Sequence, residues 1–144
     1  MSAYLDASVL LPALIDEPTS AEVHRYLDEQ SELLVSEFAA AEVASGLSRL
    51  VRMGQLGRAD ADARLDDFET WRAGVAAAIE FQPSDARLAY QYVRRFELGL
   101  RAPDALHLAM ARRLGATMAT LDRRMASAAA EFGVAVDLLG PGRG

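Results

Sequence analysis

Four acidic residues lie at or near the ends of the helices and strands that the sequence predicts. They are Asp6, Glu42, Asp104 and Asp122, and each lies in or beside an apolar run. A carboxylate at the edge of a core is costly unless a cation or hydrogen-bond donors compensate its charge. Carboxylate oxygens suit hard cations such as Mg²⁺ or Mn²⁺ and not zinc. The sequence therefore predicts one shared site for a divalent metal.

Each of these acids also has a purely structural explanation. Asp6 and Asp122 can cap the helices that follow them, and Asp104 lies in a first helical turn, where the helix dipole favours an acid. Glu42 flanks the apolar stripe of a long helix, where an exposed glutamate is ordinary. The metal-site hypothesis therefore depends on the four acids acting together.

Short apolar strands alternate with helices along the chain. We expect strands at residues 3–5, 33–35, 78–81, 117–119 and 134–136. We expect helices from Val9, at residues 20–28, 37–53, 60–73, 85–98 (capped by Ser84) and 104–114, and from Asp122. This alternation predicts an α/β fold with a parallel sheet covered on both faces. The helix at 104–114 is apolar on nearly every side and should be the central buried helix.

The predicted sheet would bring two of the acids to one edge. Asp6 directly follows the first strand, and Asp122 comes just after the strand at 117–119. In parallel sheets, ligands bind outside the carboxyl ends of the strands. We therefore expect Asp6 and Asp122 to lie at the same edge.

The chain of 144 residues, 51% of them hydrophobic, fits a single domain, which we expect over residues 1–137, with a disordered tail at 138–144. Cysteine is absent, which excludes disulfides and thiolate metal sites. The start of the chain does not read as a signal peptide, and the longest apolar stretch is too short to span a bilayer. We therefore expect a cytoplasmic protein without membrane contact.

The net charge of −6 does not suggest a nucleic-acid binder, yet all fifteen basic residues are arginine, whose forked side chain suits phosphate. Codon bias in a GC-rich genome is the alternative explanation. The chain has no lysine, which excludes a P-loop, and no Gly-x-Ser-x-Gly turn. His107 follows Asp104 by three residues and could reach the site, although a core histidine bonded to a neighbour is the simpler interpretation.

Four segments carry a resemblance to a known family, namely residues 4–8, 36–42, 101–109 and 119–122. With them, the chain resembles a PIN-domain protein, and specifically the ribonuclease toxin of a bacterial VapBC toxin–antitoxin pair. The likeness extends over about residues 2–137, and Ser8 and Thr120 match polar residues that the family keeps beside its acids. It implies a three-layer PIN-like fold with a short, mostly parallel central sheet.

The resemblance implies a metal-dependent endoribonuclease that hydrolyses RNA through a water activated by Mg²⁺ or Mn²⁺. Asp6, Asp104 and Asp122 would hold the metal, and Glu42 would hold a second ion or orient the attacking water. The resemblance also implies inhibition by a cognate VapB-like antitoxin, whose arginine would fill the acidic pocket, and a homodimer.

Candidate RNA-contacting residues on the rim are Arg49, Arg94, Arg95 and Arg101. Two other readings stay open. One is a phosphatase with an Asp-x-Ser motif, which the lack of a lysine clamp disfavours. The other is an inactive or DNA-directed PIN-domain protein that processes nucleic acid or serves as a binding scaffold.

Overall fold

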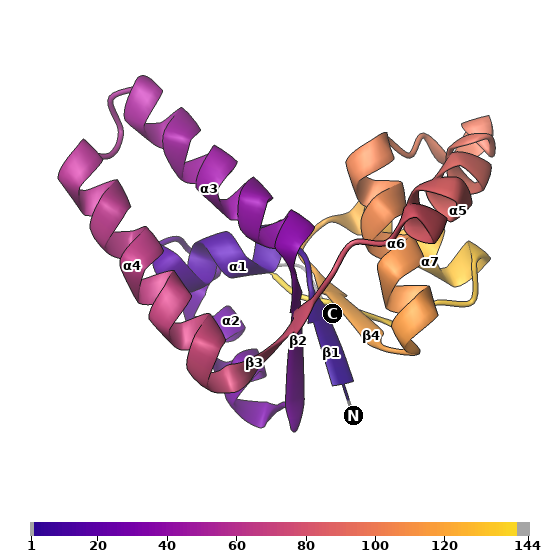
Figure 1. The fold of residues 1–144 in the computed structure, drawn as a ribbon, viewed down its shortest axis with the longest axis horizontal. Coiled ribbons are helices and arrows are strands. Elements are labelled where there is room, and N and C mark those ends of the chain that lie inside the picture. Colours follow the sequence, from indigo (N-terminus) through magenta and orange to yellow (C-terminus); the bar gives the residue numbers. More distant parts are fainter. Residues whose placement is uncertain (1, 141–144) are drawn as a thin grey trace.

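The computed structural model describes residues 2–140 and contains one five-stranded sheet in the order β3-β2-β1-β4-β5 (Figure 1). The strands are β1 (Ser2–Leu5), β2 (Glu32–Ser36), β3 (Ala76–Ile79), β4 (Thr117–Thr120) and β5 (Val136–Leu138). All four neighbouring pairs are parallel, and Tyr4 on the central strand is in register with Leu34 and Met118. The predicted α/β class with a parallel sheet is confirmed.

Helices cover both faces of this sheet. They are α1 (Ala7–Leu14), α2 (Ser20–Glu29), α3 (Glu37–Arg52), α4 (Arg58–Val75), α5 (Pro83–Val93), α6 (Ala102–Leu114) and α7 (Arg123–Glu131), with a short 3₁₀ turn, η1 (Phe96–Leu98). Side chains of a strand alternate between faces. Accordingly, Tyr4 packs with α5, α6 and α7 in one core, whereas its neighbours Ala3 and Leu5 pack with α1 to α4 in the other.

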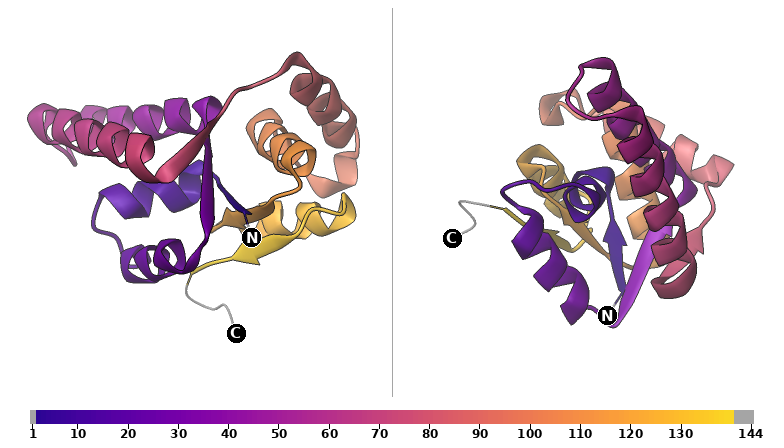
Figure 2. Two further views of the ribbon diagram at one scale, coloured as in Figure 1. Left: turned by 60° about the horizontal axis from the view of Figure 1, so that its bottom comes forward. Right: turned by 90° about the vertical axis from the view of Figure 1, so that its left-hand side faces the viewer.

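The helices on the two faces differ in how far they extend. Figures 1 and 2 show α3 and α4 as a long antiparallel pair that reaches beyond the sheet, while α5, α6 and α7 stay close to it. The turn between α3 and α4 contains Gly54 with φ of 72°, a left-handed conformation that favours glycine. The carboxyl edge of the sheet, where α3 begins after β2, is thus flanked by the projecting α3–α4 pair.

Helix α6 is the central buried helix that the sequence predicts. His107, Leu108, Ala109, Met110 and Ala111 form a continuous buried run along it. Pro103 lies in its first turn, where proline is tolerated, and Gly115 ends it with φ of 62°. Across the described residues, no helix combines the length and apolar character needed to cross a membrane.

Several predicted boundaries are wrong. Strand β3 occupies residues 76–79 rather than 78–81, and β5 occupies residues 136–138 rather than 134–136. Val134 instead closes the turn after α7, where its N–H donates to the Ala129 carbonyl. Register with the neighbouring strand, not local apolar content, sets where these short strands lie.

The helix expected at 85–98 is interrupted, and its cap is also different. Gln82, not Ser84, is the N-cap residue, because Pro83 occupies the first helical position and the Asp85 carboxylate accepts from the Gln82 N–H at 2.9 Å. The helix ends at Val93 and the chain continues as η1. These changes leave the number and order of the larger elements as predicted.

The expectation of a disordered tail from residue 138 is wrong for the first three residues. Leu138 belongs to β5, and Leu139 is buried and donates its N–H to the Thr120 carbonyl at 2.8 Å. Gly140 N–H donates to the Glu22 carboxylate at 3.0 Å. The last part of that expectation, residues 141–144, lies outside the described residues.

Candidate active site

Asp6 is a buried carboxylate at the carboxyl end of the central strand. It directly follows β1 and is the N-cap of α1, with 4% of its surface exposed. One carboxylate oxygen accepts hydrogen bonds from the backbone N–H and the hydroxyl of Ser8, and the other accepts from Thr120 Oγ1 at 2.7 Å. Both oxygens are therefore held in a fixed orientation.

The charge of Asp6 is only partly compensated. Burial raises the pKa of this carboxyl, while the hydrogen bonds from Ser8 and Thr120 act in the opposite direction. Within the described part of the chain, no arginine forms an ion pair with Asp6. A buried carboxylate that lacks a cationic partner is the kind of group that a divalent cation stabilises.

Thr120 and Ser8 connect Asp6 to the end of β4. The Thr120 hydroxyl accepts from the Asp122 N–H at 3.0 Å, and the Ser8 hydroxyl accepts from the Leu121 N–H at 2.9 Å. The loop after β4 is thereby tied to the loop after β1. The prediction that Asp6 and Asp122 lie at one sheet edge is confirmed, because β1 and β4 are parallel neighbours.

The Asp122 carboxylate caps the helix that follows it. Its Oδ1 atom accepts from the backbone N–H groups of Arg124 and Met125 at 2.9 and 3.3 Å. The capping interpretation is thus correct for Asp122, and also for Asp6 on α1. Capping leaves further lone pairs on each carboxylate, so it does not prevent metal binding.

Asp104 lies in the first turn of α6 and is half-buried. Burial raises its pKa, and the negative charge of Asp122 raises it further, while Arg101 and His107 act in the opposite direction. The negative charge of Asp122 therefore disfavours the ionised form of Asp104. Two like charges about 4 Å apart repel by roughly 4 kcal/mol at an effective dielectric near 20, which a bound cation would relieve.

Glu42 reaches the same region from the opposite face of the sheet. It lies on α3, and its Oε1 atom is hydrogen-bonded to Nε2 of His107 on α6. His107 is a buried core histidine bonded to its neighbours, as the simpler interpretation expected. The spacing of Asp104 and His107 places both on one side of α6. Nothing in the sequence indicated that His107 would be bonded to Glu42.

The four acids are linked, but they do not form a ready-made metal group. The Thr120 hydroxyl donates to the Asp6 carboxylate and accepts from the backbone N–H of Asp122. The charge of Asp122 raises the pKa of Asp104. Glu42 is hydrogen-bonded to His107, whose charge also affects Asp104. In residues 2–140, no three His, Cys, Asp or Glu side chains are grouped so that they could hold a metal ion. The donor set is nevertheless all oxygen, which fits Mg²⁺ or Mn²⁺.

The candidate rim arginines have different surroundings. Arg101 precedes α6 and influences the pKa of Asp104. Arg95 is paired with Glu97 and Glu131, and Arg94 lies over the Tyr90 ring. Arg49 is seven residues beyond Glu42, or about 10 Å further along α3. Only Arg101 has an interaction that places it near the acids.

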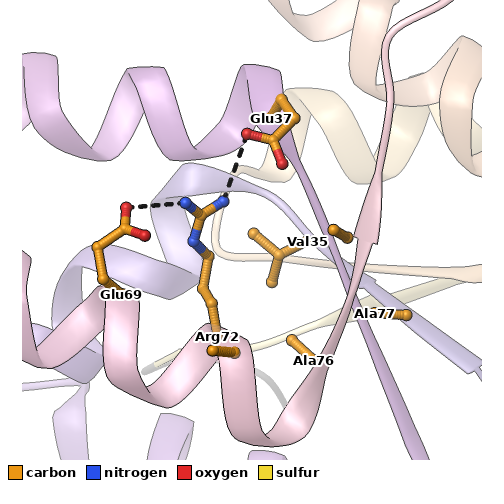
Figure 3. A pocket seen from close by; sticks show the side chains of 8 residues that line it. Val35, Glu37, Glu69, Arg72, Ala76 and Ala77 are labelled. Atoms are coloured by element: carbon orange, nitrogen blue, oxygen red, sulfur yellow. Dashed lines mark hydrogen bonds and ion pairs between the residues drawn. The ribbon is translucent and has the colours of Figure 1, made fainter.

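A hollow of about 290 Å³ lies apart from these acids, between α3, α4 and β3 (Figure 3). Arg72 points into it and pairs with Glu69 at 2.8 Å and with Glu37 at 3.7 Å. None of the four acids lines this hollow. Two glutamates neutralise its arginine, so it does not offer a site for an anion.

Comparison with known proteins places this arrangement in context. The family model described as the PIN domain matches residues 3–131. The chain is 31% identical over 138 residues to ribonuclease VapC46 of Mycobacterium tuberculosis. The matched residues cover 92% of this chain and 94% of that protein. It is 28% identical over 126 residues to ribonuclease VapC3 of Pyrobaculum aerophilum, covering 88% and 93%.

Solved structures show the same fold. FitAB bound to an IR36 DNA fragment superposes with a TM-score of 0.72 at 23% identity, covering 94% of each chain. A toxin–antitoxin complex from Klebsiella pneumoniae superposes with a TM-score of 0.63 at 17% identity, covering 87% of this chain and 90% of that one. The likeness extends over nearly the whole chain in each case.

Proposed function

The chain belongs to the PIN domain family, and from that membership we infer that it is a VapC-type ribonuclease toxin of a toxin–antitoxin system. The named ribonucleases that it resembles match over about nine-tenths of its length, so the similarity is not limited to a fragment. We propose that it hydrolyses RNA phosphodiester bonds with Mg²⁺ or Mn²⁺. The observation that carries the metal requirement is Asp6, a buried carboxylate with no arginine partner within the described residues.

Asp6, Asp104 and Asp122 are the proposed metal ligands, with Glu42 as a fourth ligand or as the group that orients the attacking water. When bound, a divalent cation supplies charge neutralisation at the phosphodiester and a lower pKa for water. Ser8 and Thr120 support Asp6 by donating to opposite carboxylate oxygens, which fixes the plane of the carboxylate. Glu42 and Asp104 would then face the substrate from α3 and α6.

Arg101 is the preferred candidate for contact with the RNA backbone. It lies at the start of α6, next to the proposed ligand Asp104, and its side chain is exposed. Arg94, Arg95 and Arg49 are weaker candidates, because the first two are engaged with other side chains and the third lies further along α3. The arginine fork matches phosphate oxygens.

The proposed partners follow from the same chemistry. A VapB-like antitoxin would inhibit the enzyme by placing a cationic side chain among the four acids, where it would offset their mutual repulsion. The toxin–antitoxin complex of similar fold supports a protein partner of this type. A homodimer and a cytoplasmic location complete the proposal.

A second candidate is an inactive or DNA-directed PIN-domain protein, including a binding scaffold. The observation that favours inactivity is the lack of a preformed three-residue metal group in residues 2–140. The catalytic proposal holds that metal binding draws the carboxylates together. Calorimetric titration with Mn²⁺ distinguishes the two candidates, since a scaffold would give no heat that depends on the acids.

The test is RNA cleavage by the purified protein in Mg²⁺, Mn²⁺ or EDTA. We expect cleavage that requires the metal and that Asp6→Asn lowers by at least about a hundredfold, because it removes a charge at the proposed metal. Asp62→Asn, on the exposed surface of α4, is the matched control and should cleave as the wild type does. Cleavage that persists in EDTA, or in Asp6→Asn, would contradict the proposal.

Asp104→Asn gives an independent test of the crowded acids. Burial and the charge of Asp122 both disfavour the ionised form of Asp104. We expect this variant to melt at a higher temperature than the wild type in EDTA, while its RNA cleavage is lost. A lower melting temperature in EDTA would show that repulsion between the acids is not significant.

A further inference from the structure

A line of hydrogen bonds runs from the sheet interior to Glu42. The Tyr4 hydroxyl lies 2.8 Å from Ser36 Oγ and 2.6 Å from Nδ1 of His107, and Nε2 of His107 contacts Glu42 Oε1. Ser36, Tyr4 and His107 are each at most 3% exposed. This chain, which we name the Ser36–Glu42 relay, joins β2, β1, α6 and α3.

The hydrogens of the relay can be assigned from one end. Ala39 N–H donates to Ser36 Oγ at 2.9 Å, so the Ser36 hydroxyl is free to donate to Tyr4. Tyr4 then donates to Nδ1 of His107, which leaves the ring hydrogen on Nε2 to donate to Glu42. This arrangement gives every acceptor a donor.

Two further observations support this assignment of the hydrogens. Burial raises the pKa of Tyr4, so its hydroxyl keeps the hydrogen that it donates. The imidazole of His107 is packed between two aromatic rings, with the Tyr4 ring edge-on at 5.6 Å and the Phe38 ring tilted by 48° at 5.1 Å. The imidazole ring is therefore held in place by its neighbours and does not rotate freely.

Glu42 differs from the other three acids in how it is supported. Asp6 and Asp122 accept from backbone N–H groups of the helices that they cap, and Asp104 lies in the first turn of α6. Glu42 lies inside α3, where backbone N–H groups are already used by the helix. Its long side chain has three rotatable bonds, and its carboxylate is hydrogen-bonded to His107.

We propose that His107 is a positioning residue, which holds the Glu42 carboxylate at the site through the Ser36–Glu42 relay. This rests on the proposed function, in which Glu42 acts at the metal or on water. His107 itself does not touch the substrate. Groups that orient the groups around a metal typically change affinity or activity by about ten- to a hundredfold when removed.

The first test concerns the imidazole hydrogen and needs no metal. The chain has two histidines, His24 and His107, so His24→Gln leaves a single imidazole for ¹⁵N NMR. On the neutral imidazole we expect the hydrogen on Nε2 and a bare Nδ1. A hydrogen on Nδ1 would overturn the proposed direction of the relay.

The second test uses two amides of similar size. In His107→Gln the amide nitrogen can take the place of Nε2 and donate to Glu42, whereas in His107→Asn the shorter side chain leaves Glu42 without a donor. We expect His107→Asn to weaken Mn²⁺ binding in calorimetry, and to lower kcat more than it raises KM, by about tenfold or more. His107→Gln should restore most of both quantities, and equal losses in both variants would overturn the proposal.

The third test separates this proposal from the proposed function. If His107 acts through Glu42, then His107→Asn should have no further effect on Mn²⁺ affinity in a Glu42→Gln background. A full additional loss in that background would mean that His107 acts by another route. If Glu42→Gln alone changes neither Mn²⁺ affinity nor cleavage, the failure lies in the proposed function and not in the relay.

Discussion

Thr120 is the residue through which the two strand-end acids are connected. Its hydroxyl donates to Asp6 Oδ2 and accepts from the Asp122 N–H, and the side chain is fully buried. A hydroxyl can serve both as donor and as acceptor, which a carboxylate cannot do at neutral pH. Thr120 therefore organises the site without carrying charge.

We expect Thr120→Val to destabilise the protein by about 1–3 kcal/mol, because it leaves Asp6 Oδ2 and the Asp122 N–H without a partner. Urea denaturation measures this difference. Thr117→Val is the matched control in the same strand, since the Thr117 hydroxyl has no hydrogen bond within the described residues. Equal losses in the two variants would mean that the hydroxyl of Thr120 is not important.

Burial of Asp6 predicts a pH dependence of stability in EDTA. The folded state holds the proton of Asp6 to a higher pH than the unfolded state, whose carboxyl pKa is about 3.9. Ionisation of Asp6 therefore destabilises the folded state. This destabilisation is absent below the pKa of the unfolded chain and increases as the pH rises from that value through the folded pKa. The stability of Asp6→Asn relative to the wild type should rise from pH 3.5 to pH 7, as measured by urea denaturation, and a constant difference would contradict this.

At the scale of the elements, α6 is the helix that presents two site groups. It carries Asp104 in its first turn and His107 one turn later, while its buried run packs against the sheet. Its far end is fixed by Arg113, which donates to both oxygens of Asp85 on α5 at 2.8 and 3.0 Å and to the Glu80 carbonyl at 3.1 Å. The position of the site thus depends on how α6 is anchored.

We expect Asp85→Asn to cost about 3 kcal/mol, because it breaks a two-point ion pair whose carboxylate is buried and leaves the Arg113 guanidinium without its counter-charge. Glu69→Gln is the matched control, since it removes an exposed partner of Arg72 and should change stability by no more than about 1 kcal/mol. Urea denaturation of both variants measures the contrast. A loss in Asp85→Asn no larger than that of the control would contradict the anchoring role.

Elements with strong local signals were predictable, and elements with weak ones were not. Helix α6 has a proline in its first turn, a continuous apolar run and a glycine after its last turn, and its predicted bounds differ from the observed ones by two residues at one end. Strand β3 consists of Ala76 to Ile79, half of it exposed at the sheet edge. Alanine has little preference for strands, so only pairing with β2 places β3.

At the scale of the whole molecule, the strand order explains how distant acids meet. β1 lies between β2 and β4, so the residues after β1 and β4 meet although they are more than a hundred positions apart. The two cores, one on each face, hold α3 and α6 against the same sheet. Glu42 on α3 and His107 on α6 can then meet across the carboxyl edge.

Metal binding should stabilise the whole fold if the acids form one site. At a Mn²⁺ concentration a hundredfold above the dissociation constant, the free energy of unfolding should rise by about 2.7 kcal/mol, provided that the unfolded chain does not bind the ion. Asp6→Asn should show a much smaller rise at the same concentration. Thermal denaturation across a Mn²⁺ series measures both, and an unchanged wild-type curve would remove the basis for the metal site.

The sequence by itself determined the fold class, the order of the larger elements and the family, because these depend on apolar periodicity, caps and short motifs that are local along the chain. The sequence also identified the four acids as candidates, since carboxylates beside apolar runs can be recognised from the amino-acid sequence. Only the tertiary structure decided what each acid contacts. Tyr4 and His107 are 103 residues apart, and the bond from His107 to Glu42 spans 65, so no local pattern encodes them. Such contacts depend on strand order and on packing across two faces of a sheet, which are properties of the folded chain alone.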